Sequence, residues 1–116
     1  MTTSGFKDLI VWQKSIVLVT KIYSVTKSFP KEETYGLTSQ IRRAAVSVPS
    51  NIAEGRRRGG ETEFRQFLRI AFGSLSEVET QLEIARQLGY VPVDGSFNEI
   101  GRLIEEISRM LNSMTS

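Results

Sequence analysis

Apolar residues recur every three or four positions along four stretches of the chain, and this spacing predicts four α-helices. The stretches run from about Asp8 to Ser28, from Tyr35 to Arg58, from Glu61 to Leu88, and from Ser96 to about Met114. No segment has the alternation typical of a β-strand. The pattern therefore predicts one all-α domain over residues 1–116, an antiparallel up-down-up-down four-helix bundle.

The second stretch, YGLTSQIRRAAVSVPSNIAEGRRR, contains a proline at position 49. A proline inside a helix removes one backbone hydrogen bond and costs about 3 kcal/mol unless the surroundings compensate. The helix could instead stop at Val48, with Pro49 in the first turn of a new helix. A continuous helix kinked at Pro49 is favoured, because the apolar spacing crosses the proline without a change of phase. Its apolar stripe consists of Leu37, Ile41, Ala44, Ala45, Val48, Ile52 and Gly55.

The first stretch has an unusually wide apolar face, made of two stripes that together span roughly 200° of the helix. One stripe consists of Leu9, Trp12, Ile16, Val19 and Tyr23, and the other of Val11, Leu18, Ile22, Val25 and Phe29. The interior of a bundle covers about half of that arc. We therefore expect the second stripe to contribute to a contact between subunits, through Val11, Leu18, Ile22 or Val25.

Local signals mark the remaining helix ends. Gly59 and Gly60 supply a turn after the second helix, and Gly89 ends the third. Ser96 and Glu99 have the spacing of a capping box at the start of the fourth helix. Leu75 and Ile104 lie in the middle of the apolar stripes of the third and fourth helices, so both are expected in the core.

Several kinds of catalysis lack the residues that they need. The chain contains neither cysteine nor histidine, so disulfides, thiolate chemistry, histidine-activated serines and Glu-x-x-His metal sites are excluded. Glu79 and Glu83 are the nearest candidates for a carboxylate metal site, but both lie off the core stripe. Asn51 and Glu54, at the border of the second helix's stripe, suit structural hydrogen bonds. We expect no enzyme, no catalytic residue, no bound metal and no cofactor.

The N-terminal sequence and the hydropathy of the chain bear on its location. MTTSGF lacks the apolar run of a signal peptide. No apolar segment approaches the roughly 20 residues that span a bilayer. A cytoplasmic protein that does not associate with membranes is expected.

Positive charge is concentrated in the middle of the sequence, although the net charge is only +2. Residues 42–69 contain three glutamates and seven arginines, namely Arg42, Arg43, Arg56, Arg57, Arg58, Arg65 and Arg69. Arginine offers a planar fork of donors that matches phosphate, so these seven residues are the predicted nucleic-acid contacts. The ordinary alternative is a solvated helix end, where cations are favourable in any case.

Three separated blocks of the chain resemble a known family. They are FKDLIVWQKS, SQIRRAAVSVPSNIAEG and EFRQFLRIAFGSLSEVETQLEIARQLGY, and in this order they are similar to the four-helix-bundle proteins encoded in intervening sequences of bacterial 23S ribosomal RNA genes. The resemblance implies a homopentamer of bundles. Relatives of the family include nucleic-acid-binding accessory proteins of diversity-generating retroelements. The chain departs from the family pattern after Gly55, where Arg56, Arg57 and Arg58 replace the usual aromatic and lysine or serine.

Two classes of function remain open on the sequence. The first is an oligomeric accessory module that binds RNA or DNA through phosphate contacts, which the charge distribution and the resemblance favour. The second is an oligomeric scaffold for protein partners without nucleic-acid binding, which the wide apolar face of the first helix favours.

Overall fold

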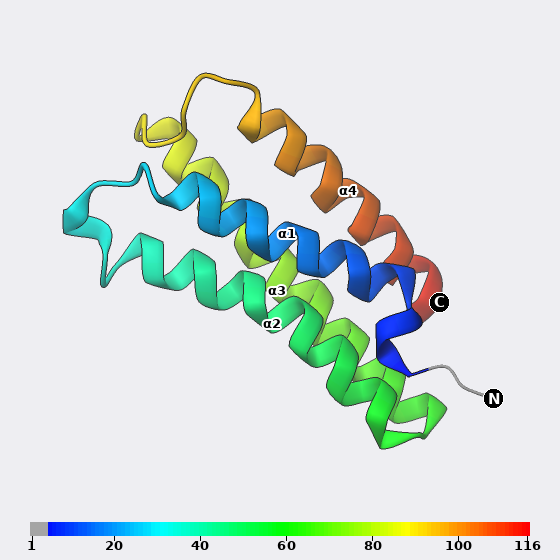
Figure 1. The fold of residues 1–116 in the computed structure, drawn as a ribbon. Helices are drawn as coiled ribbons and strands as arrows, with labels where there is room; N and C mark the ends of the chain where they lie inside the picture. Colours follow the sequence, from blue (N-terminus) through cyan, green and yellow to red (C-terminus); the bar gives the residue numbers. More distant parts are fainter. Residues whose placement is uncertain (1–4) are drawn as a thin grey trace.

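The computed structural model describes residues 5–116, which form four α-helices joined by short connections (Figure 1). The helices are α1 (Ile10–Thr26), α2 (Leu37–Arg58), α3 (Glu61–Gln87) and α4 (Ser96–Thr115), with single 3₁₀ turns at η1 (Phe6–Asp8) and η2 (Lys31–Glu33). Consecutive helices run in opposite directions, and these residues contain no strand. The predicted up-down-up-down bundle is confirmed, with each helix end within two residues of the predicted one.

The start of α4 differs from the prediction in its cap. Ser96 is the first helical residue, so it does not form a capping box with Glu99. Its backbone N–H and its hydroxyl both donate to Oδ1 of Asp94. These hydrogen bonds hold the pKa of the Asp94 carboxyl below its usual range. Asp94 takes the capping role because Gly95 adopts a left-handed conformation (φ 90°) that turns the chain just before the helix.

Helix α2 continues through Pro49 from Leu37 to Arg58, and the predicted kink is not confirmed. The proline ring is buried, so it belongs to the packed side of the helix. The observed continuity excludes the alternative in which the helix stops at Val48. Burial of the ring offsets part of the cost of the missing backbone hydrogen bond.

The core of the bundle is built from one apolar stripe of each helix. Leu75 and Ile104 are buried as predicted. The assignment of the two α1 stripes is reversed, because Val11, Leu18, Ile22 and Val25 are at most 5% exposed and lie inside the bundle. These four residues therefore cannot form a contact between subunits, and the corresponding prediction is wrong.

Two hydroxyl residues explain why the pattern of α1 misled. Ser15 and Thr26 lie on the buried side, where a purely apolar count disfavours them. The Ser15 hydroxyl donates to the carbonyl of Val11 and the Thr26 hydroxyl to that of Ile22, each at 2.7 Å. Because both hydroxyls are satisfied within their own helix, their burial costs little.

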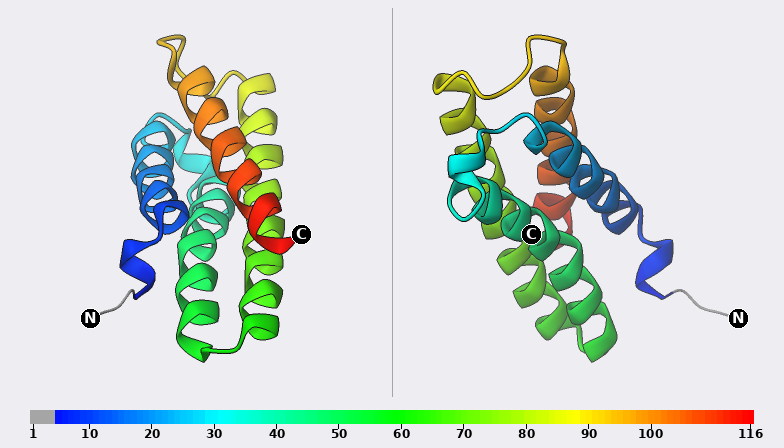
Figure 2. Two further views of the ribbon diagram at one scale, coloured as in Figure 1. Left: turned by 90° about the vertical axis from the view of Figure 1, so that its right-hand side faces the viewer. Right: turned by 60° about the vertical axis from the view of Figure 1, so that its left-hand side comes forward.

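Helices α2 and α3 form a long hairpin that is closely packed along its length. A β-carbon placed on Gly55 would lie 2.5 Å from Cβ of Phe67, so only glycine permits this approach of the two helices. Ser47 and Ser74 share a 2.8 Å hydrogen bond across the same interface. The turn of this hairpin projects past the end of α4 and the start of α1, as both views in Figure 2 show.

The opposite end of the bundle is held by a carboxylate that serves two elements. Oε1 of Glu33 accepts the backbone N–H of Leu37 at the start of α2, and Oε2 accepts the Tyr90 hydroxyl, both at 3.0 Å. The hydrogen bond to Glu33 raises the pKa of Tyr90. Glu33 thus ties the loop between α3 and α4 to the entrance of α2.

Candidate nucleic-acid interface

The projecting end of the α2–α3 hairpin gathers five of the seven predicted arginines. Three occupy the last turn of α2 and two the first turns of α3, so the antiparallel path of the hairpin brings them together: Arg56, Arg57, Arg58, Arg65 and Arg69. We call these five residues the arginine tip. Glu54, Glu61 and Glu63 lie in the same segment, which leaves an excess of two positive charges.

Two arginines of the tip are paired with glutamates. Arg58 contacts Glu54 at 3.0 Å and Glu63 at 3.6 Å, and Arg65 contacts Glu61 at 3.7 Å. All these pairs are open to solvent, and exposed ion pairs contribute little to stability. The same guanidinium groups can exchange their glutamates for phosphate oxygens at small cost.

The other arginines of the tip contact rings or the backbone. The Arg57 guanidinium lies 5.2 Å from the ring centroid of Phe6, in η1. Arg69 donates to the carbonyl of Thr115, at the end of α4, over 3.5 Å. Among the described residues neither Arg57 nor Arg69 forms a salt bridge, so both retain donors for an external anion.

A hollow of about 410 Å³ opens beside the tip. Its walls combine two arginines, one glutamate, two apolar side chains and the glycine turn: Arg56, Gly59, Gly60, Glu61, Phe64, Arg65 and Met114. The Arg56 guanidinium lies 5.9 Å from the ring centroid of Phe64. Met114 reaches the hollow from the last turn of α4, so three helices contribute to it.

Arg42 and Arg43 do not belong to this cluster. They precede Arg56 by about 14 residues, which separates them from the tip by about 20 Å along α2. Arg42 is held against α1, where its Nε donates to the Thr26 hydroxyl at 2.8 Å and its guanidinium lies 4.5 Å from the Tyr23 ring centroid. Arg43 lines a shallow hollow between α2 and α3 together with Glu77. The structure therefore divides the predicted basic surface into two parts.

No site predicted from the sequence includes Phe6, Phe64 or Met114. Phe64 and Met114 are only partly buried: Phe64 lies next to the projecting turn of the hairpin, and Met114 lies in the last turn of α4. Their exposure depends on the relative lengths of the helices after packing. The position of Phe64 in the first turn of α3, beside the glycine turn, was the one local signal that could have indicated it.

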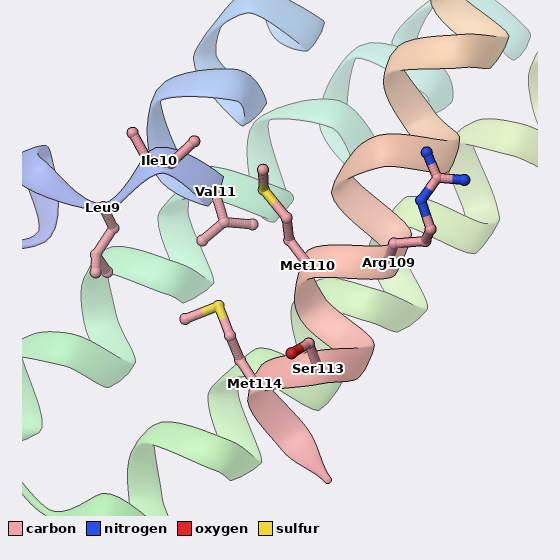
Figure 3. Close-up of a pocket in the computed structure, with 7 residues that line it drawn as sticks. All are labelled: Leu9, Ile10, Val11, Arg109, Met110, Ser113 and Met114. Atoms are coloured by element: carbon pink, nitrogen blue, oxygen red, sulfur yellow. The ribbon is translucent and has the colours of Figure 1, made fainter.

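A second pocket, of about 460 Å³, lies between the start of α1 and the end of α4 (Figure 3). Apolar side chains predominate in its walls, and the polar groups are Arg109 and Ser113; the lining is Leu9, Ile10, Val11, Arg109, Met110, Ser113 and Met114. Figure 3 shows the Met110 and Met114 side chains reaching toward Leu9 and Val11. No constellation for catalysis is present in this pocket.

The described residues hold no cluster of three or more side chains suited to a metal ion. Glu83, one of the two candidate ligands, instead accepts hydrogen bonds from Arg86 and Gln87. These contacts lower its pKa to about 2. Asn51 donates to the carbonyl and the hydroxyl of Ser47, and Glu54 pairs with Arg58, so both have structural partners as expected.

No helix within residues 5–116 combines the length and the hydropathy of a membrane span. Fold and site together define a class: a small antiparallel four-helix bundle with a projecting, arginine-bearing hairpin.

Within that class, the chain belongs to the family of 23S rRNA-intervening sequence proteins, whose family model matches residues 7–113. The fold is similar to the crystal structure of a protein of unknown function from the S23 ribosomal protein family of Bacteroides thetaiotaomicron. That similarity has a TM-score of 0.83 at 24% identity, over 92% of this chain and 99% of the other. The chain has no match among curated proteins.

Proposed function

We propose that the protein is a non-enzymatic, homo-oligomeric bundle that binds RNA or DNA by contacting phosphates with its arginine tip. The observation that carries this proposal is the position of four arginines around the turn of a hairpin that projects beyond the rest of the bundle, with Arg69 beside the end of α4. A projecting end reaches a nucleic-acid backbone without steric hindrance from the other helices. Such a partner is consistent with a cytoplasmic protein.

Binding through these residues should show little sequence preference. Guanidinium groups match phosphate oxygens, whereas sequence is read by helices or strands that enter a groove. The end of a helical hairpin presents no such element to base edges. Recognition of the backbone predicts an affinity that falls steeply as salt rises.

Assembly would strengthen this weak single site. An excess of two positive charges per chain supports few phosphate contacts, but several tips held at fixed spacing can engage one polymer together. The family resemblance supports a closed ring of five as the assembly. Oligomerisation is therefore part of the proposed mechanism.

The outer side of the α1–α2 pair is the surface best suited to this assembly. Ile16, Tyr23 and Val46 are each about 40% exposed there. Trp12 and Val19 lie beside them and are partly buried. The contact of Tyr23 with Arg42 shows that the two helices meet along this side. We call it the α1–α2 face, and it replaces the four core residues as the proposed interface.

The decisive experiment changes Arg56, Arg57 and Arg58 together to glutamine. Binding of labelled RNA and DNA is measured by fluorescence anisotropy from low to high salt. Each lost phosphate contact flattens the plot of log affinity against log salt by about one unit, so the variant should bind more weakly to every sequence and lose about two to three units of slope. Circular dichroism and sedimentation should show unchanged helicity and assembly size.

A matched control removes the same charge elsewhere. Lys27, Lys31 and Arg102 are exposed, lie outside the tip and form no salt bridge among the described residues. Their joint change to glutamine should leave the slope nearly unchanged. If both triple variants lose the same affinity, net charge explains the effect and the arginine tip has no special role. A parent protein that binds no nucleic acid at low salt would refute the proposal.

The second candidate function is an oligomeric scaffold for protein partners, without nucleic-acid binding. The exposed apolar residues of the α1–α2 face favour it. It becomes the better account if the parent assembles into a ring but binds neither RNA nor DNA.

A further inference from the structure

The hollow beside the arginine tip has walls of two chemical kinds. Arg56 and Arg65 bring positive charge, whereas Phe64 and Met114 bring apolar surface from two different helices. A site for phosphate alone needs no aromatic wall. The volume of about 410 Å³ falls within the range of about 300–1,000 Å³ that is usual for pockets of small organic groups.

We propose that this hollow accepts an unpaired nucleobase against Phe64 while Arg56 and Arg65 contact the flanking phosphates, so that the protein prefers single-stranded to duplex nucleic acid. This inference rests on the proposed function and specifies which form of nucleic acid is bound, single-stranded or duplex. A base enters a side pocket only if it is not stacked and paired within a duplex. Aromatic rings beside a positively charged groove are the usual means of holding single strands without reading their sequence.

The partial burial of Phe64 suits this role. Cδ1 of its ring lies close to α2, since a β-carbon on Gly55 would be 3.2 Å from it. Phe64 also lines the hollow. The Arg56 guanidinium lies 5.9 Å from the ring centroid, so an incoming base would stack on Phe64 as Arg56 turns toward a flanking phosphate. A ring already packed against α2 loses little side-chain freedom on binding.

Glu61 is the one acidic group in the lining and opposes a phosphate there. Its side chain is 86% exposed and pairs with Arg65 at 3.7 Å. An incoming phosphate would replace this carboxylate as the partner of Arg65. The change Glu61→Gln should therefore tighten binding of a single strand by about two- to threefold.

The inference is tested with a mixed-sequence DNA of one length in three forms: single-stranded, annealed to its complement, and single-stranded with all internal bases replaced by abasic sites. The parent should bind the intact single strand most tightly. The change Phe64→Leu keeps apolar bulk but removes the ring, and should weaken binding of the intact strand by about 5- to 20-fold without changing the salt slope. It should leave binding of the abasic strand unaltered.

Phe97 supplies the matched control, because the Arg86 guanidinium lies 5.5 Å from its ring centroid at the other end of α3. The change Phe97→Leu should not alter binding of any of the three forms. The comparison of intact and abasic strands uses the parent protein, so it decides the matter even if Phe64→Leu fails to fold.

The outcomes separate this inference from the proposed function. Equal affinity of the parent for duplex, intact strand and abasic strand, with a salt slope that depends on the arginines, would overturn the unpaired-base site and leave phosphate binding in place. Absence of binding to all three forms would overturn both.

Discussion

Glycine is used in two opposite ways inside the helices of this protein. At Gly55 the missing side chain lets α2 approach α3, since a β-carbon would meet Phe67 at 2.5 Å. At Gly101, in α4, no atom lies within 4 Å of the corresponding position. The first glycine is required by packing. The second has no packing role within the single chain and only lowers the helix propensity of α4.

This difference predicts opposite signs for the same substitution. The change Gly55→Ala should lower the free energy of unfolding by about 1–3 kcal/mol, because the added methyl group forces the two helices apart. The change Gly101→Ala should raise it by up to about 1 kcal/mol through better helix propensity. Urea unfolding followed by circular dichroism measures both. Stabilisation by Gly55→Ala would contradict the close approach of α2 and α3.

At the scale of the helices, burial follows one stripe per helix and leaves the neighbouring apolar positions exposed. On α3, Leu75 is 2% exposed, whereas Ile84, about two and a half turns away on the opposite side, is 45% exposed. On α4, Ile104 is buried as deeply as Leu75. Similar side chains on one helix therefore experience different environments.

Truncation to alanine should reveal this contrast. The changes Leu75→Ala and Ile104→Ala should each lower the free energy of unfolding by about 2–5 kcal/mol, from lost transfer energy and the cavity left behind. Ile84→Ala should change it by less than about 0.5 kcal/mol. Denaturant titration of the three variants decides the matter, and losses below about 1 kcal/mol at both core positions would refute the assignment.

For the whole molecule, the exposed apolar residues are not confined to one side. Ile16 and Val46 lie on the α1–α2 face, while Ile70 and Ile84 lie on α3 and are somewhat more exposed. The α1–α2 face is distinguished because exposed apolar residues of two helices lie there beside the contact of Arg42 with Tyr23. Aromatic residues and arginine are enriched at protein interfaces.

Charge placed on this face should dissociate the assembly. The double change Ile16→Glu and Val46→Glu would bury unpaired carboxylates in the contact, which costs about 2–5 kcal/mol. Sedimentation at micromolar concentration should show an oligomer for the parent and a monomer of unchanged helicity for the variant. Ile70→Glu with Ile84→Glu is the control and should retain the oligomer. A monomeric parent would refute the assembly.

The arginine tip marks the limit of what could be predicted for the site. The sequence indicated seven arginines as one surface, and the hairpin topology brings five of them together because Arg56 and Arg65 flank one short turn. Arg42 lies outside the tip, because it contacts Thr26 and Tyr23 of α1. Counting charges along the sequence cannot reveal such a contact with another helix. The hollow with Phe64 was not predicted, since it exists only where α4 ends.

The sequence by itself determined the number of helices, their ends within two residues, and the stripes of α2, α3 and α4. These features follow from short-range physics: apolar spacing, glycine turns and backbone preferences act within a few residues. Tertiary structure alone decided which half of the apolar face of α1 is buried, with Val11 and Leu18 inside and Ile16 outside. It also decided how far the α2–α3 hairpin projects. Both depend on how helices rotate and slide against one another, and that is settled by the packing of all four together.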